Sequence, residues 1–161
     1  MDPIKLIIQT LEAMVGVHSQ LLDLAKEKRS VLVEGDINQL QNIIYRESSC
    51  TEEIQKLEEQ RKALVKVYLV GKGLPEKDST IEELLKVQGD VEYGTNLSGL
   101  AKQLRSLIRE ISQLNESNQQ LIQTSLSYTQ FMIGMHVRKE PSIGYGPKSK
   151  NRYSNLLDAK I

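Results

Sequence analysis

The sequence predicts an all-α protein: an elongated antiparallel helical bundle or coiled coil of three long helices plus one short helix, with a flexible C-terminal tail. Three observations predict this fold. Between residues 97 and 137, apolar side chains recur in alternating steps of three and four, which is the spacing of a coiled-coil seam. The chain has one Phe, no Trp and 26% charged residues, so it has few large apolar side chains with which to fill a spherical core. Gly and Pro gather in a few short breaks between long periodic stretches.

The seam between residues 97 and 137 predicts one helix of roughly 60 Å, at about 1.5 Å per residue. Leu and Ile fill its first half, whereas Asn118 and Ser125 interrupt the second half before the aromatic and Met residues. We therefore expect the first half to hold the protein together and the second half to serve another purpose. The seam positions are Leu97, Leu100, Leu104, Leu107, Ile111, Leu114, Asn118, Leu121, Ser125, Tyr128, Met132 and Met135.

The first helix is predicted to start at Asp2, because a capping carboxylate is followed there by a proline that needs no N–H in the first turn. It ends at Gly35, which can adopt the left-handed conformation that closes a helix. Asp36 and Gln39 form a capping box for the next helix. A turn this short makes the first two helices an antiparallel hairpin.

The second helix is predicted to run to Val70, before a break at residues 71–75. Glu47 and Arg61 fall at positions of its seam where apolar residues are expected. We expect them to be paired or snorkelling residues at the seam margin rather than catalytic groups. Further along, Ser79 and Glu82 predict a capping box for the short helix. Residues 89–95 are predicted to be a loop, with Thr95 or Asn96 capping the long third helix.

The charge of the chain is balanced overall but uneven locally. The chain has 21 basic residues (Lys and Arg) and 21 acidic residues (Asp and Glu), so its net charge does not indicate binding to nucleic acid or to an acidic substrate. Residues 138–161 carry six basic and two acidic residues, a net charge of plus four. Pro and Gly at residues 141–147 end any helix, and the apolar residues from Tyr153 onward are too few to hold a helix alone. We predict a helical bundle domain at residues 1–137 and a flexible tail at 138–161 that folds on binding another polypeptide.

The sequence predicts a soluble cytoplasmic protein. A single Cys50 cannot form an internal disulfide, which fits a reducing compartment. The first residues lack a signal-peptide pattern, and no apolar run is long enough for stable membrane insertion.

No motif predicts catalysis, a metal site or a cofactor. His18 and His136 have no Cys, His, Asp or Glu at ligand spacing, and His18 falls on an apolar stripe where a core histidine is expected. Cys50 has no activating base nearby in the sequence, so we expect a packed thiol. A narrow bundle offers no water-excluding pocket for acid–base work, and we therefore predict that the protein is not an enzyme.

Several segments, in their order and spacing over residues 4–132, resemble the FlgN-type flagellar export chaperone family. They are Leu11-Glu12, the run from His18 to Lys28, the turn Glu34-Gly35-Asp36, the run from Ile54 to Arg61, and the stretch from Leu114 to Tyr128. The resemblance implies an all-helical bundle in the bacterial cytoplasm. It also implies a chaperone that binds hook-filament junction proteins, namely hook-associated proteins one and three. Such a chaperone prevents their premature assembly or aggregation and delivers them to the type III export gate.

The same resemblance implies roles for residues near the C-terminus. In that family the end of the long helix and the tail bind the client, and a tyrosine near the end of the helix docks on the cytoplasmic ring of the export gate. Tyr128 matches the docking tyrosine, although ordinary seam packing is an equally good interpretation of its position. The implied client-binding residues are Met132, Met135, Tyr145, Tyr153, Leu156 and Leu157. The alternative function is a coiled-coil adaptor or structural subunit of a secretion apparatus without chaperone activity.

Overall fold

The computed structural model describes residues 2–75 and 79–139, and in these residues every regular element is an α-helix. Three of the helices are long and one is short, as predicted, which confirms the all-α fold class. The chain forms two compact units, Met1–Leu121 and Ile122–Ile161. The predicted tail at 140–161 lies outside the described residues. The elements are α1 (Pro3–Glu34), α2 (Ile37–Gly71), α3 (Ile81–Val87) and α4 (Val91–Lys139).

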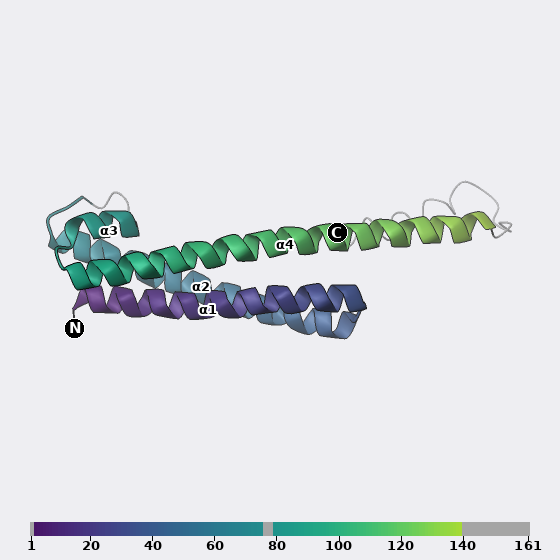
Figure 1. The fold of residues 1–161 in the computed structure, drawn as a ribbon, viewed down its shortest axis with the longest axis horizontal. Helices are drawn as coiled ribbons and strands as arrows, with labels where there is room; N and C mark the ends of the chain where they lie inside the picture. The colour runs from purple at the N-terminus through teal and green to yellow at the C-terminus, as the bar shows by residue number, and fades with distance from the viewer. Residues whose placement is uncertain (1, 76–78, 140–161) are drawn as a thin grey trace. The chain divides into compact units, whose positions relative to one another are not determined.

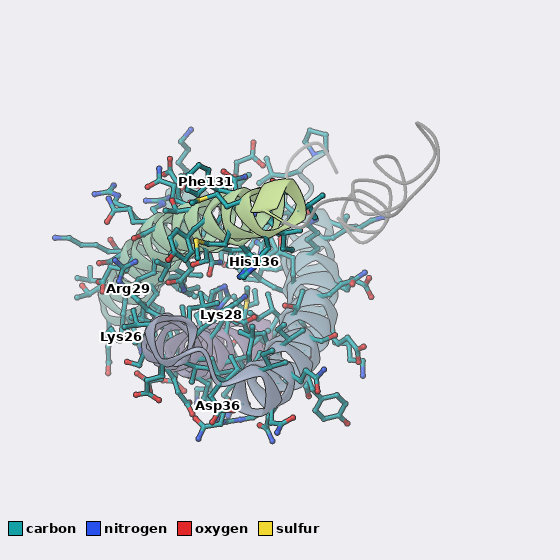
Figure 2. The ribbon with its side chains drawn as sticks, turned by 90° about the vertical axis from the view of Figure 1, so that its right-hand side faces the viewer. Lys26, Lys28, Arg29, Asp36, Phe131 and His136 are labelled. Carbon is teal, nitrogen blue, oxygen red and sulfur yellow. The ribbon has the colours of Figure 1, made fainter. Side chains whose placement is uncertain are left out.

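Both ends of α1 form as their residues predict. The Asp2 carboxylate accepts a hydrogen bond from the Ile4 N–H at 3.1 Å, and proline follows at the first helical position. Gly35 closes the helix at φ 74°, in the left-handed region that favours glycine. Asp36, which lies in the turn between α1 and α2 (Figure 2), then accepts from the Gln39 N–H at 3.1 Å. The short turn makes α1 and α2 an antiparallel pair, confirming the predicted hairpin.

The core of the first unit is shared by all four helices. Figure 1 shows α1, α2 and the first part of α4 side by side, with α3 near the end where the chain begins. Leu97 of α4 packs in one cluster with the first turns of α1, so α4 and α1 run in the same direction. This common core, formed where α3 covers the bundle, contains five side chains that are 0% exposed: Ile7, Leu11, Val65, Leu84 and Leu97.

Nearer the α1–α2 turn, the second apolar cluster contains residues of α1 and α2 only. In this region α4 contacts α1 through polar groups. The Asn118 amide nitrogen donates to the Ala25 carbonyl at 3.0 Å, and Arg29 donates to the Ser117 hydroxyl at 2.5 Å. Asn118 is 2% exposed, and its amide oxygen has no hydrogen-bond partner among residues 2–75 and 79–139. Polar contacts thus join α4 to α1 in this part of the first unit.

The two charged residues in the seam of α2 are paired, as predicted. Glu47 accepts from Lys28 of α1 at 3.0 Å. Arg61 is 9% exposed; it donates to both oxygens of Glu58 at 2.7 Å and to the Ser79 carbonyl, before α3, at 2.8 Å. These hydrogen bonds hold the pKa of the Glu58 carboxyl below its ordinary value of 4.5. Arg61 therefore attaches the segment before α3 to α2.

The start of α4 was predicted wrongly. Residues 91–95 are helical rather than a loop, because Asp90 caps the helix by accepting from the N–H groups of Glu92 at 2.9 Å and Tyr93 at 3.3 Å. Gly94 is accommodated in the first turn, where a Cβ would come within 2.5 Å of the Gln88 side chain.

The cap of the short helix also differs from the prediction, by one residue. Thr80 rather than Ser79 caps α3, by accepting from the Glu83 N–H at 3.3 Å. Ser79 instead offers its carbonyl to Arg61. Both capping-box patterns are present in the sequence, and the contact with Arg61 selects the later one.

Replacing the buried arginine by an apolar side chain of similar length is expected to destabilise the bundle. Arg61→Met should lower the free energy of unfolding by about 1.5–3 kcal/mol, because hydrogen bonds from a charged group to Glu58 and Ser79 are lost. Urea unfolding followed by circular dichroism measures this change. The control is Lys62→Met, whose ammonium lies 3.6 Å from Glu58 but is 61% exposed, and it should change stability by less than about 0.5 kcal/mol. Equal effects of the two substitutions would contradict the role of Arg61.

The stabilisation from the Arg61–Glu58 pair should depend on pH. Because the pKa of Glu58 is lowered in the folded state, the contribution is complete above pH 4.5 and is lost as the pH falls through the lowered pKa. The difference in unfolding free energy between wild type and Arg61→Met should therefore narrow below pH 4.5. Urea titrations at a series of pH values measure this difference, and a gap that stays constant with falling pH would contradict the assignment.

Candidate functional site

Three of the residues implicated by sequence lie on one exposed face of α4. Tyr128 is 64% exposed, Met132 38% and Met135 41%. Their spacing of four and three places them on the same side of the helix. Because all three are exposed, none is a buried core residue of the described chain. Their role in binding stays a prediction, but the surface that it requires is present.

Phe131 belongs to the same face and was not among the predicted site residues. It is the one Phe of the chain and is 64% exposed, although a large aromatic side chain is usually buried. In Figure 2, Phe131 and His136 point to different sides of α4. We call the set Tyr128, Phe131, Met132 and Met135 the Tyr128 row. The signal for Phe131 was present in the sequence, because it is an aromatic residue directly beside the Met residues.

A second set of apolar residues lies on another side of the same helical stretch. Ile133 follows Tyr128 by five positions, which at 3.6 residues per turn is a rotation of about 140°. Ile122, Leu126 and Ile133 are half-buried, and Val137 is 45% exposed. We call Ile122, Leu126, Ile133 and Val137 the Ile133 row. The sequence analysis missed the Ile133 row, because its residues do not belong to the seam that alternates steps of three and four.

The surface that carries both rows is electrically neutral. From Ser117 to Val137 there is no Asp, Glu, Lys or Arg, although 26% of the whole chain is charged. The polar residues of this stretch are Gln, Ser, Thr and Asn, together with His136. A helix that faces water normally carries charged residues on its solvent side, whereas charges are depleted at the centre of protein interfaces because burying them is costly. This neutral segment, residues 117–137, has the composition of a surface that becomes covered.

The other predicted site residues cannot be placed. Tyr145, Tyr153, Leu156 and Leu157 lie at 140–161, outside the described residues. Their assignment to client binding stays a prediction.

The residues considered for catalytic or metal chemistry have structural surroundings. His18 is 6% exposed and its Nδ1 donates to the Met14 carbonyl at 2.6 Å, which confirms the predicted core histidine. Cys50 is 8% exposed in the α1–α2 cluster, which confirms the packed thiol. Within residues 2–75 and 79–139, no three His, Cys, Asp or Glu side chains are grouped as metal ligands would be.

A surface hollow lies between α1 and α2 beside Cys50. Its polar walls include Glu27 and Arg46, which form an exposed ion pair at 3.5 Å. This pair neutralises its own charges. The lining residues are Gln20, Asp23, Leu24, Glu27, Tyr45, Arg46, Ser49 and Cys50.

None of the helices in the described part of the chain combines the length and the apolar character needed to cross a bilayer.

Comparison with known proteins identifies the family. The family model FlgN, described as FlgN protein, matches residues 1–152, which is nearly the whole chain. A search of the curated proteins found no match, and neither did a search of the solved structures. The match includes the bundle and the neutral segment on α4, in agreement with the resemblance of the individual sequence segments. The chain belongs to the FlgN family of flagellar export chaperones.

Proposed function

We propose that this protein binds hook-filament junction proteins, hook-associated proteins one and three, in the bacterial cytoplasm and delivers them to the flagellar export gate. Membership of the family supports the general role of an export chaperone. The observation that carries the binding surface is the exposure of the Tyr128 row on a neutral stretch of α4. No other described part of the chain combines exposed aromatic and Met side chains in this way.

The chemistry of the Tyr128 row suits this client. A junction protein has amphipathic terminal helices that pack against neighbours in the filament, and before export their apolar faces favour aggregation. An unbranched Met side chain adapts to differently shaped apolar surfaces, and an aromatic ring contributes large contact area. Met132 and Met135, beside Tyr128 and Phe131, therefore provide an adaptable apolar face for an amphipathic helix of the client.

The tail is proposed to add to this contact. Tyr145, Tyr153, Leu156 and Leu157 supply further apolar side chains beyond α4. Residues 138–161 carry a net charge of plus four, from six basic and two acidic residues, so they favour an acidic surface on the client or the gate. The neutral segment and the basic tail then act on different parts of the partner.

Tyr128 is proposed to dock on the cytoplasmic ring of the export gate. It lies in the same row as Met132, so a client helix that covers Met132 lies next to the Tyr128 ring as well. Docking on the gate therefore requires either an exposed edge of that ring in the complex or partial release of the client. The second possibility links arrival at the gate with unloading.

A charge in the middle of the Tyr128 row is expected to abolish client capture. Met132→Glu should weaken binding of a purified junction protein by at least tenfold, because the carboxylate loses its water when the interface closes. Isothermal titration calorimetry measures the affinity, and circular dichroism confirms that the helices remain. The control is Gln113→Glu, an exposed position on the same helix outside the neutral segment. If Met132→Glu binds the junction protein as tightly as wild type, the Tyr128 row is not the client site. If the wild-type chain forms a dimer and captures no client, the adaptor function is favoured.

Removing the Tyr128 ring is expected to separate binding from export. Tyr128→Ala should weaken client binding much less than Met132→Glu does, since Phe131, Met132 and Met135 remain, but should fail to support secretion of hook-associated proteins. Pull-down with the junction protein and analysis of secreted proteins in complemented cells measure the two properties. If Tyr128→Ala loses client binding to the same extent as Met132→Glu, the ring serves the client contact and a separate docking role is refuted.

A further inference from the structure

The neutral segment carries apolar residues on two sides of α4. The Tyr128 row and the Ile133 row differ by a rotation of about 140° at 3.6 residues per turn. Val137 is 45% exposed and Met135 41%, so both rows include side chains accessible to a partner. An amphipathic helix has one apolar face and a charged face opposite to it, whereas residues 117–137 have two apolar rows and no charged face.

The polar positions between the rows are neutral as well. Gln123, Ser127 and Gln130 are exposed and lie between the two rows on the helix surface. Their amide and hydroxyl groups form hydrogen bonds to water or to another polypeptide, and burying them in paired form costs little compared with burying a charge. The neutral composition therefore extends around α4 and is not confined to one face.

The size of the Ile133 row shows what kind of partner it suits. A large aliphatic side chain offers roughly 100 Å² of apolar area, so four of them supply at most about 400 Å². A stable protein pair buries about 800 Å² on each partner. A second copy of this chain, held by this row alone, would therefore have about half the area that a dimer needs. Adding the Tyr128 row, in which Tyr128 and Phe131 each contribute about 150–250 Å² and each Met roughly 100 Å², brings the total to about 900–1,100 Å², which is enough for a stable pair.

We infer that the client holds α4 from both sides, with one amphipathic segment on the Tyr128 row and a second amphipathic segment of the same client on the Ile133 row. This inference rests on the proposed function, and it specifies the partner. The client must supply two helical segments whose contact faces are apolar and uncharged. With α4 between them, the complex contains a three-helix arrangement in which the neutral segment is enclosed.

The test compares charged substitutions on the two rows with a charged substitution on α4 outside the neutral segment. Ile133→Glu and Val137→Glu change the second row, Met132→Glu changes the first, and Gln113→Glu, at an exposed position of α4 outside the neutral segment, is the matched control. Titration calorimetry with the purified junction protein should show at least tenfold weaker binding for each row variant and an unchanged affinity for the control. Circular dichroism confirms folding, and Val137→Glu, at a more exposed position, serves if Ile133→Glu loses helical signal.

Cross-linking then shows which client segments lie on each row. A photo-reactive residue at position 132 and another at position 133, each in the otherwise unchanged chain, should cross-link to two different segments of the junction protein. Peptide mapping by mass spectrometry identifies the segments. Cross-links from both positions to one segment would overturn the inference.

The outcomes separate this inference from the proposed function. If the wild-type chain binds no junction protein, the proposed function fails and the inference fails with it. If Met132→Glu weakens binding while Ile133→Glu and Val137→Glu do not, the proposed function stands and only the second contact is refuted. If light scattering shows a wild-type dimer that Val137→Glu dissociates, the second row is a contact between copies, and the inference is overturned.

Discussion

The apolar contact among Ile7, Leu11, Val65, Leu84 and Leu97 is the constraint on which the rest of the first unit depends. These five fully buried side chains come from all four helices. A helix as short as α3 is not stable alone in water, and even long helices in proteins depend on the burial of an apolar face. Polar contacts reinforce this junction, through Arg61 on the segment before α3 and through the pairing of Arg105 with Glu82.

The role of α4 changes along its length because its neighbours change. At Leu97 and Leu104 it belongs to the common core, and at Asn118 it is attached to α1 by a hydrogen bond. In the second unit the aromatic and Met side chains are exposed, and no charged residue separates them. A single helix thus supplies both the packing that stabilises the fold and the surface proposed for the client. Substitutions near the client surface can therefore be tested without altering the common core.

Local interactions explain how much of the fold could be predicted from sequence. The caps at Asp2 and Asp36 and the turn at Gly35 depend on neighbouring residues, and they formed as expected. The start of α4 was missed because Gly94 and Thr95 suggest a loop, while the cap at Asp90 outweighs them. The choice of Thr80 over Ser79 as the cap of α3 depends on the hydrogen bond from Arg61 to the Ser79 carbonyl. This contact joins residues that are distant in the sequence, so the local pattern could not predict it.

The exposed apolar surface of α4 was predicted only in part, for a related reason. A seam pattern shows which side chains share a face, but it cannot show whether another helix covers that face. Tyr128 fitted a buried seam and a binding surface equally well, and the structure shows it exposed. The second row was overlooked because it does not follow the seam. The absence of charge over residues 117–137 needed no structure, and it marks the whole surface more clearly than any individual residue.

Asn118 has a consequence for the alignment of the helices. Its amide reaches one particular carbonyl, that of Ala25, from a buried position. Sliding α4 along α1 by a single turn would move the amide nitrogen away from this acceptor and leave it unpaired in the interior, whereas Leu side chains tolerate such slippage. One asparagine therefore sets the register of α4, so that the uncharged stretch begins at the same height on α1 in every copy of the protein.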